Sequence, residues 1–427
     1  MNLLVVGGGG REHAIIKKLK ENPTVETIYA LPGNGGIAQD AVCVPSIGAK
    51  DIAKIVDFAT SHSVDFAVVA PDDPLALGCV DRLHEAGIPC FGPVARAARI
   101  ESSKVFAKNL MRKYGIPTAR YEVFGDPAKA LAYLRETACF PIVVKADGLA
   151  LGKGVLIPQN LQEAEAAVKS IMEDKAFGDS GNEIVIEEFL TGPEVSVLAF
   201  TDGTAIVPMV SSMDHKRAGD GDTGPNTGGM GTVAPNPCYT PEVAAKCMEK
   251  IFLPTLAAMR AEGCPFKGCL YFGLMLTPDG PRVIEYNCRF GDPETQVVLP
   301  LLKTDLLTVM LAVEGETLGE LQVEWTGGSA ACVVLASQGY PGGYETGKEI
   351  TVPEDLPANV TVYHAGDKLP EDGKLVTGGG RVLGVTATGE TLSAALEAAY
   401  AAAERVTFDG KYLRRDIGQR ALRALEG

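Results

Sequence analysis

Glu285 and Asn287 lie two positions apart in the stretch 282–287, which follows an apolar run and a Pro-Asp-Gly-Pro turn. This pattern predicts two strands joined by a turn. Side chains two apart on a strand share a face, so we expect Glu285 and Asn287 to lie side by side, with Ile284 and Tyr286 on the opposite face. A carboxylate beside an amide oxygen suits Mg²⁺, which takes a few hard oxygen ligands and completes its shell with phosphates and water.

Arg289 follows this pair and offers a guanidinium fork for a carboxylate or a phosphate. Asp214 precedes a long polar, glycine-rich stretch, Gly219–Gly231, which we expect to be a functional loop. With Asp214 gripping an ammonium and Arg289 a carboxylate, an amino acid would fit between them. The alternative for Arg289 is a structural ion pair with a nearby acid, and His215 is a weaker candidate for a general base.

The stretch 145–154 is a glycine- and lysine-rich segment between two strand-like runs. It differs from a P-loop in its spacing and has Gly154 where Ser or Thr is required. We expect a cationic hairpin loop that folds over the β- and γ-phosphates of a nucleotide, with Lys145 and Lys104 adding fixed charge. A hairpin that binds nothing is the alternative.

The strand-like run Ile184–Leu190 leads to Glu194. Its backbone edge could hydrogen-bond a purine, and Glu194 could accept from a ribose, although glutamates at a strand end are more often solvated.

Four glycines, Gly7–Gly10, separate an apolar strand from a helical pattern and predict an anion site at a helix N-terminus. Neither register of this turn fits the dinucleotide pattern, so an NAD site is disfavoured. The loops 32–36 and 71–74 follow later strands of the same expected sheet, and all three should meet at its carboxyl edge, where a small phosphorylated substrate would bind. The alternative is a tight turn without a ligand.

The order of the predicted strands and helices that position these residues indicates several structural units. Apolar strands alternate with helices up to about residue 100, which predicts a parallel sheet wrapped by helices. We expect this first unit over 1–102, an α+β unit over 103–325 with an inserted lid over about 123–188, and a small α/β unit over 326–427. In the lid, Asn160 and Glu163 resemble a capping box at a helix start.

The amino-acid composition of the chain excludes some classes of function. Asp and Glu number 54 against 39 Lys and Arg, a formal net charge of −15 spread along the chain. Nucleic acids and anionic membranes need a cationic footprint, so neither is an expected partner. No signal peptide or membrane span is apparent, which predicts a cytoplasmic protein. The ten cysteines form no C-x-x-C pair, and we interpret them as reduced core residues.

Taken together, the motifs resemble those of the glycinamide ribonucleotide synthetase family, also called phosphoribosylamine–glycine ligases, of the ATP-grasp superfamily. The resemblance covers essentially the whole chain. It rests on GGGGREHA at 7–14, PGNGG at 32–36, SSK at 102–104, VVKADGLALGKGV at 143–155, DHKR at 214–217, GPNTGGMG at 224–231, EYNCRFGDPETQ at 285–296, LASQGYPG at 335–342 and RRDIGQRAL at 414–422.

The resemblance implies an N-terminal Rossmann-like domain, an ATP-grasp core with its lid, and a C-terminal domain beside the N-terminal one. The implied reaction joins glycine to 5-phosphoribosylamine with ATP, in purine synthesis, through a glycyl phosphate. Mg²⁺ or Mn²⁺ is the implied cofactor, and the small-molecule substrates would be handled by a monomer or weak dimer. Ala70-Pro71-Asp72 departs from the usual Gly-Pro-Glu of the third N-terminal loop but keeps the acid.

Carried over by position, the resemblance implies three groups of site residues. ATP would contact Lys104, Lys145, Gly148, Gly152, Lys153, Gly154, Glu187, Glu188, Leu190 and Glu194. The metal would be held by Glu285 and Asn287. The other substrates would contact Gly9, Gly10, Asn34, Asp214, Lys216, Gly229 and Arg289, with Arg289 and Lys145 catalytic.

Two other functions stay open at this point. One is an ATP-grasp ligase for a different acid or amine. The other is a non-catalytic nucleotide-binding protein that has kept the fold.

Overall fold

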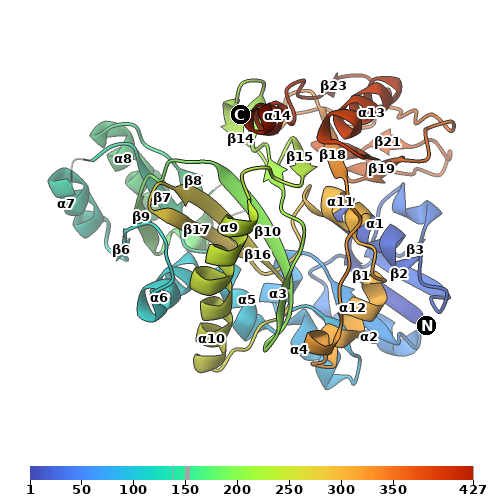
Figure 1. Cartoon of the computed structure of the whole chain (residues 1–427), viewed down its shortest axis with the longest axis horizontal. Coiled ribbons are helices and arrows are strands. Elements are labelled where there is room, and N and C mark those ends of the chain that lie inside the picture. The colour runs from blue at the N-terminus through green and yellow to red at the C-terminus, as the bar shows by residue number, and fades with distance from the viewer. Residues whose placement is uncertain (138, 150–153, 427) are drawn as a thin grey trace.

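The computed structural model describes residues 1–137, 139–149 and 154–426. Its first unit is a parallel sheet with the strand order β3-β2-β1-β4-β5 (Figure 1). The strands are β1 (Asn2–Gly7), β2 (Thr27–Pro32), β3 (Val42–Cys43), β4 (Phe66–Val69) and β5 (Cys90–Phe91). The helices are α1 (Gly10–Leu19), α2 (Ile52–Ser61), α3 (Asp72–Ala76), α4 (Cys79–Glu85) and α5 (Ala95–Ser102). The predicted helix-wrapped parallel sheet is confirmed.

Strand β1 shows why this sheet is covered on both faces. Leu4 and Val6 belong to one hydrophobic core, and Leu3 and Val5 belong to another. Successive side chains of a strand point to opposite faces, so a continuous apolar run fits a strand buried on both sides.

The centre of the molecule is an antiparallel sheet with the order β11-β10-β16-β17. Its strands are β10 (Glu194–Asp202), β11 (Ile206–Pro208), β16 (Lys267–Thr277) and β17 (Gly280–Asn287). The neighbouring helices are α6 (Lys104–Tyr114), α9 (Pro241–Cys247), α10 (Leu253–Ala261), α11 (Thr295–Val298) and α12 (Leu306–Glu314). Helix α6 begins after Ser103, whose side chain accepts a hydrogen bond from the backbone N–H of Phe106.

A smaller sheet stands to one side with its own core, in the order β6-β9-β7-β8 (Figure 1). It contains β6 (Tyr121–Phe124), β7 (Ile142–Ala146), β8 (Val155–Leu156) and β9 (Ile184–Glu188), with α7 (Pro127–Thr137) and α8 (Leu161–Val168). The side chain of Asn160 caps α8 by accepting from the N–H of Glu163, as predicted. We call this unit the lid.

The C-terminal sheet has the order β12-β15-β18-β22-β19, with β23 paired to β18. Its strands are β12 (Met213–Asp214), β15 (Gly231–Ala234), β18 (Ser329–Ser337), β19 (Val360–His364), β22 (Arg381–Gly389) and β23 (Lys411–Tyr412). The pair β20 (Asp367–Lys368) and β21 (Val376–Thr377) and the helices α13 (Leu392–Arg405) and α14 (Gln419–Glu426) complete the unit. Strands β12 and β15 therefore join a sheet whose other strands lie about a hundred or more residues later in the chain.

The expectation of a long loop over Gly219–Gly231 is wrong. The chain instead forms a two-stranded hairpin, β13 (Arg217–Gly219) and β14 (Thr223–Asn226), and then enters β15. Polar, glycine-rich strands lack the apolar alternation that reveals a half-buried strand in a sequence.

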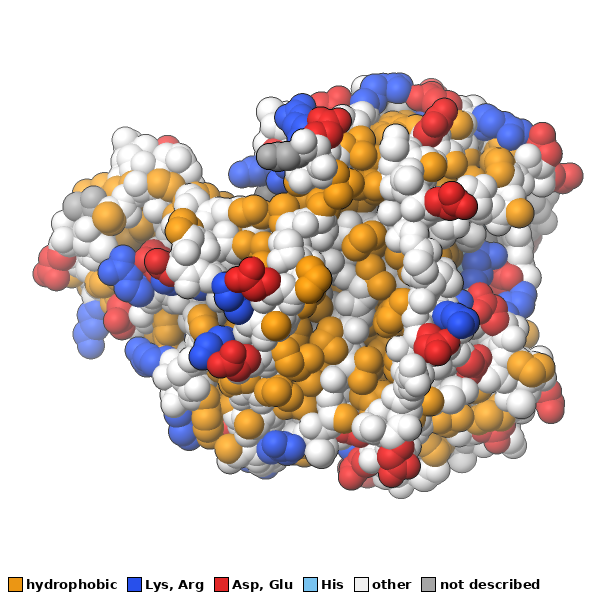
Figure 2. Space-filling model, in the orientation of Figure 1, with side chains coloured by type: hydrophobic (Ala, Val, Ile, Leu, Met, Phe, Trp, Pro, Cys, Tyr) orange, Lys and Arg blue, Asp and Glu red, His pale blue; other side chains and the backbone are white. Residues whose placement is uncertain are grey.

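Figure 2 shows a face hollowed between the lid and the C-terminal unit, with acidic and basic side chains interspersed over it. All ten cysteines are free thiols and most are buried, which confirms their interpretation as core residues. Among the helices of the described ranges, none is sufficiently long and apolar to cross a membrane.

Candidate active site

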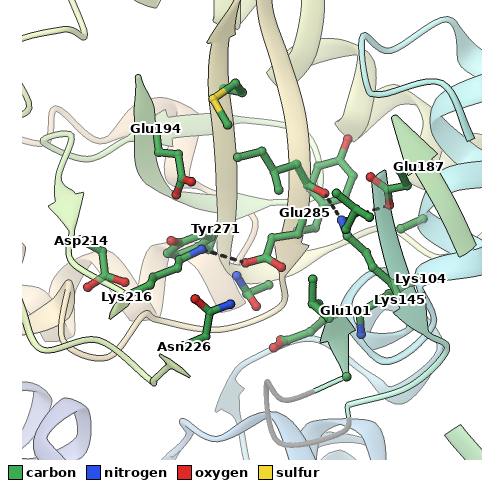
Figure 3. Close-up of a pocket in the computed structure, with 18 of the residues that line it drawn as sticks. Glu101, Lys104, Lys145, Glu187, Glu194, Asp214, Lys216, Asn226, Tyr271 and Glu285 are labelled. Carbon is green, nitrogen blue, oxygen red and sulfur yellow. Dashed lines mark hydrogen bonds and ion pairs between the residues drawn. The ribbon is translucent and has the colours of Figure 1, made fainter. Parts of the chain in front are cut away.

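A cavity of about 500 Å³ lies where the lid, the central sheet and the β13–β14 hairpin meet (Figure 3). It collects predicted site residues from segments far apart in the chain. Those expected to bind ATP are Lys104, Lys145, Gly154, Glu187, Glu188, Leu190 and Glu194. Those expected to bind the metal or the other substrates are Asp214, Lys216, Glu285, Asn287 and Arg289.

Some of the predicted site residues do not line this cavity. Gly9, Gly10, Asn34, Gly148 and Gly229 are described but are not among the residues that line this cavity. Gly148 is nevertheless next to the cavity, because its carbonyl accepts a hydrogen bond of 2.6 Å from Lys104 Nζ. Gly152 and Lys153 lie outside the described residues.

Glu285 and Asn287 sit on β17 beside each other at the cavity wall. The pairing of β16 with β17 shifts register between Gly273 and Leu274, which leaves Ile284 as an extra residue in β17. This bulge interrupts the alternation of the strand, and Ile284 and Tyr286 both line the cavity together with Glu285 and Asn287.

Glu285 is surrounded by cations. Burial raises the pKa of Glu285, but Lys216, Lys145, Lys104 and Arg289 outweigh burial and lower it to about 2. Lys216 Nζ is 3.6 Å from Glu285 Oε1. The carboxylate is therefore ionised at neutral pH, the state that binds a divalent cation.

Two buried lysines, Lys108 and Lys145, form ion pairs with the same carboxylate, that of Glu187. Glu187 lies 3.0 Å from Lys145 Nζ through one oxygen and 3.0 Å from Lys108 Nζ through the other. Burial lowers the pKa of Lys108 to about 8, with Glu187 opposing it and Lys145 adding to it. Lys145 also donates to the carbonyl of Ile284, 3.1 Å away, which fixes its ammonium against β17. Sequence reasoning missed Lys108, although it stands one helical turn after Lys104 and so shares its face.

The predicted purine edge runs along the end of β9. The side chain of Glu188 is held by Arg120 at 2.9 Å and by Arg282 at 3.2 Å, and its backbone N–H donates to the Arg120 carbonyl at 3.0 Å. Apolar groups line the cavity beside it, namely Val143, Val155, Ile157 and Met275. An apolar wall of this kind suits an adenine ring.

Arg289 forms an ion pair with an acid, which is the structural role that we gave as the alternative to ligand binding. Its Nη2 lies 2.8 Å from Glu101 Oε1 and 3.4 Å from Asn287 Oδ1. Burial lowers the pKa of Arg289, and Glu101 and Asp72 more than compensate and raise it. The guanidinium still lines the cavity, so the ion pair orients a cation that faces a ligand. Glu101 was not singled out from the sequence; its place just before Lys104 is the signal that was available.

Asp214 lies near the buried carboxylate of Glu294. Burial and the nearby Glu294 raise the pKa of Asp214 well above its usual value, although Lys216 lowers it. Glu294 accepts a hydrogen bond of 3.0 Å from Tyr271, whose hydroxyl also meets Ser196 Oγ at 2.7 Å. A cationic group entering here would relieve the repulsion between the carboxylates. Tyr271 was not singled out from the sequence, because β16 reads there as an ordinary apolar strand. Glu294 was not singled out either, although it lies in the motif that follows Arg289.

Both ring nitrogens of His215 form hydrogen bonds with backbone groups. Its Nε2 accepts from the N–H of Gly418 at 3.1 Å, and its Nδ1 lies 3.1 Å from the carbonyl of Gly231. Burial, with Arg420, lowers the pKa of His215 to about 4. Since both ring nitrogens are occupied, the general-base hypothesis for His215 is not supported.

The three N-terminal loops converge as predicted. Gly33 N donates to the Gly7 carbonyl at 3.1 Å, and Asn34 Nδ2 donates to the Gly8 carbonyl at 3.0 Å. The amide of Asn34 also reaches the carbonyl of His364 at 2.9 Å, so it joins this edge to the C-terminal unit. Asp72, from the third loop, lines the cavity.

The side chains that could serve as metal ligands limit the kind of metal site that the protein can form. Within the described residues there is no group of three or more His, Cys, Asp and Glu arranged to hold a metal by protein ligands alone. Glu285 and Asn287 instead offer two oxygens, which fits a cation that takes further ligands from phosphates and water.

Comparisons with known proteins cover nearly the whole chain. Three domains described under "Phosphoribosylglycinamide synthetase" match it: the N domain over residues 1–101, the ATP-grasp (A) domain over 102–295 and the C domain over 330–420.

Individual relatives agree. A phosphoribosylamine–glycine ligase of Caldanaerobacter subterraneus subsp. tengcongensis is 48% identical over 417 residues, 98% of this chain and 99% of the relative. A bifunctional purine biosynthetic protein of Pichia angusta is 49% identical over 99% of this chain, which spans 54% of that longer protein. The crystal structure of a phosphoribosylamine–glycine ligase of Thermotoga maritima superimposes with a TM-score of 0.86 at 39% identity, covering 98% of this chain and 100% of that one.

The predicted resemblance is thereby confirmed, and the multidomain fold with it. The chain belongs to the phosphoribosylglycinamide synthetase family of ATP-grasp enzymes.

Proposed function

We propose that this ATP-dependent ligase, which joins glycine to 5-phosphoribosylamine in purine biosynthesis, does so through a glycyl phosphate held in the described cavity. The observation that carries this mechanism is the ionised Glu285 facing Lys104, Lys145, Lys216 and Arg289. Such a cluster suits the charge that spreads over a transferring phosphoryl group.

In the first step, a carboxylate oxygen of glycine attacks the γ-phosphorus of ATP and ADP leaves. Arg289 orients the glycine carboxylate, and Asp214 faces its ammonium. Lys104 and Lys145 stabilise the negative charge on the phosphoryl oxygens. In the second step, the amine of phosphoribosylamine attacks the glycyl carbonyl, phosphate leaves and the amine loses a proton.

The metal belongs to the first step. We propose that Glu285 and Asn287 hold Mg²⁺ or Mn²⁺, which when bound neutralises charge on the β- and γ-phosphates. The ionised state of Glu285 and the small protein donor set both support this assignment.

The remaining contacts are proposed from the family resemblance and from the residues that line the cavity. We propose that adenine lies beside Glu188 and Leu190, that its ribose meets Glu194, and that Gly148–Gly154 covers the phosphates. Gly9, Gly10 and Asn34 would bind phosphoribosylamine at the edge of the N-terminal sheet, near Asp72. We also propose that the protein works in the cytoplasm as a monomer or weak dimer, without nucleic acid or membrane partners.

The decisive experiment measures ADP release from ATP and Mg²⁺, with phosphoribosylamine generated in situ. Glycine is compared with alanine, serine and no amino acid. The proposal expects release that requires both glycine and the amine, with glycinamide ribonucleotide identified by mass. Release that depends on another acid would contradict the substrate assignment.

A further inference from the structure

The β13–β14 hairpin carries part of the cavity wall. Lys216, Arg217, Asn226 and Thr227 all line the cavity, and strand β14 is exposed along its length. A two-stranded hairpin is only marginally stable by itself in water. Something else must therefore hold it in place.

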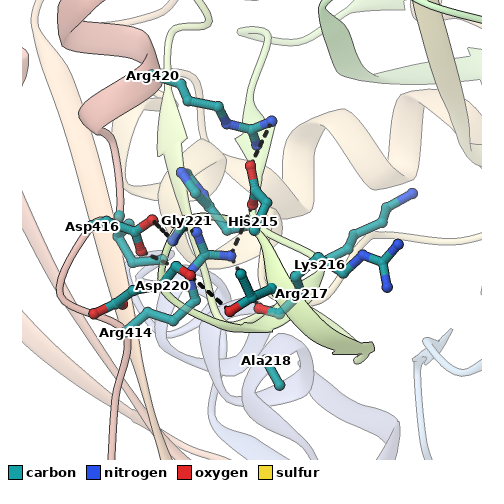
Figure 4. A network of polar contacts seen from close by, with 12 residues as sticks. His215, Lys216, Arg217, Ala218, Asp220, Gly221, Arg414, Asp416 and Arg420 are labelled. Carbon is teal, nitrogen blue, oxygen red and sulfur yellow. Dashed lines mark hydrogen bonds and ion pairs between the residues drawn. The ribbon is translucent and has the colours of Figure 1, made fainter.

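The segment 412–420, which runs from the end of β23 into the first turn of α14, supplies that support (Figure 4). Arg414 is its centre, with a side chain only 1% exposed. Its guanidinium makes a two-pronged contact with Asp416, at 2.8 and 2.7 Å. The remaining nitrogen reaches the hairpin, donating to the Arg217 carbonyl at 3.0 Å and to Asp222 Oδ1 at 3.1 Å.

Further hydrogen bonds join the hairpin to the same segment. Asp416 Oδ2 accepts from the N–H of Gly221 at 2.8 Å, and Asp220 Oδ1 accepts from the N–H of Arg415 at 2.8 Å. Tyr412 donates its hydroxyl to the Ala218 carbonyl at 2.7 Å. The tip of the hairpin is thus bound to a segment almost two hundred residues later in the chain.

The start of the hairpin is bound to the same segment. Arg420 donates to the Asp214 carbonyl at 3.3 Å and lies 3.3 Å from Asp222 Oδ2. Asp222 has a left-handed backbone, with φ of 55°, a conformation that a non-glycine residue keeps only when its surroundings impose it.

We propose that Arg414 is a positioning residue for the ligase reaction. By gripping Asp222 and the Arg217 carbonyl, it fixes the hairpin so that Asp214 and Lys216 face the amino-acid end of the cavity. The inference rests on the proposed function. The proposed ATP contacts lie on other elements, among them α6, β7, β9 and β10, so loosening the hairpin should affect glycine more than the nucleotide.

The test compares Arg414→Ala with Arg415→Ala. The neighbouring Arg415 is the matched control, because its guanidinium is 67% exposed and pairs with Glu404 alone among the described residues. We expect Arg414→Ala to raise the KM for glycine about ten-fold or more, the effect of losing one or two charge-assisted hydrogen bonds. The KM for ATP should stay near that of the control.

Hydrogen–deuterium exchange gives a readout that needs no turnover. Residues 217–227 should exchange faster in Arg414→Ala than in Arg415→Ala, while the central sheet stays protected. If the wild type makes no glycinamide ribonucleotide, the proposed function fails, and the exchange result still reports whether Arg414 holds the hairpin.

Three outcomes would overturn the proposal: hairpin exchange equal to that of the control, an unchanged KM for glycine despite faster exchange, or equal losses for glycine and ATP. If Arg414→Ala does not fold, Tyr412→Phe serves in its place. It removes only the hydroxyl bond to Ala218 and should change exchange and the KM for glycine in the same direction, by less.

Discussion

Glu285 shows how single side chains set the chemistry of the cavity. Its side chain is half-buried, and the surrounding lysines lower its pKa and keep it ionised. A carboxylate in that state offers a hard oxygen to a cation.

Replacing Glu285 with Ala should lower the rate of glycine-dependent ADP release by roughly 10²–10³-fold, because the metal that neutralises charge on the transferring phosphoryl group loses a protein ligand. The rate is measured with a coupled ADP assay, and circular dichroism checks the fold. Glu242→Ala, a change at an exposed glutamate paired with Lys246, is the control and should behave as wild type. Unchanged ADP release by folded Glu285→Ala would refute the metal assignment.

Glu187 is the second residue with a large expected effect. Glu187→Gln leaves Lys108 and Lys145 buried beside a neutral amide and should reduce the free energy of unfolding by about 3–5 kcal/mol. Urea unfolding measures this. Glu165→Gln, which breaks a more exposed pair with Arg135, should cost less than about 1 kcal/mol. Similar losses for both variants would show that the buried pairs contribute little.

At the scale of elements, the β7–β8 hairpin depends on one glycine. Gly148 has φ of +128°, and a Cβ there would collide with the side chain of Ser180. Its carbonyl also accepts from Lys104. The start of the loop, and the lysine beside it, are therefore fixed by a backbone conformation that other residues rarely adopt.

Gly148→Ala should raise the KM for ATP about ten-fold, since a strained backbone of about 1–3 kcal/mol would move the loop and Lys104. Steady-state kinetics with varied ATP measures it. Gly280→Ala is the matched control, because Gly280 has φ of +117° but open space around the added Cβ. An ATP KM equal to that of the control would show that the loop tolerates the change.

At the scale of the whole molecule, buried histidines join units. His13 on α1 accepts from the N–H of His364 at 2.8 Å and meets Asp40 at 2.9 Å. Burial lowers the pKa of His13 to about 4, although Asp40 opposes it, and the pKa of His215 is lowered to about 4 as well. Between pH 4 and 6.5 the unfolded histidines bind protons that the folded ones do not. Their contribution to stability therefore falls as the pH falls through this window.

Replacing His13 with Gln should flatten the pH dependence of the free energy of unfolding between pH 6.5 and 4. The slope should decrease by up to about 1.4 kcal/mol per pH unit, the value for one proton. Urea titrations at several pH values, compared with wild type, measure the difference. An unchanged or steeper slope would contradict the assignment of this proton uptake to His13.

The sequence by itself determined the kinds of groups and their local placement. Alternation on a strand put Glu285 beside Asn287, and the glycine turns marked the edge of the first sheet. Motifs of known order also identified the family. These features depend on residue type and on neighbours a few positions away, which a sequence displays directly.

Only the tertiary structure decided the long-range partners. It pairs β15 with β18, brings Arg414 to the hairpin, gives Arg289 the carboxylate of Glu101 and adds Lys108 and Tyr271 to the site. It also introduces the bulge at Ile284, which interrupts the alternation of β17. Each depends on packing between segments distant in the chain, where burial, charge and register are settled together and no local pattern records the result.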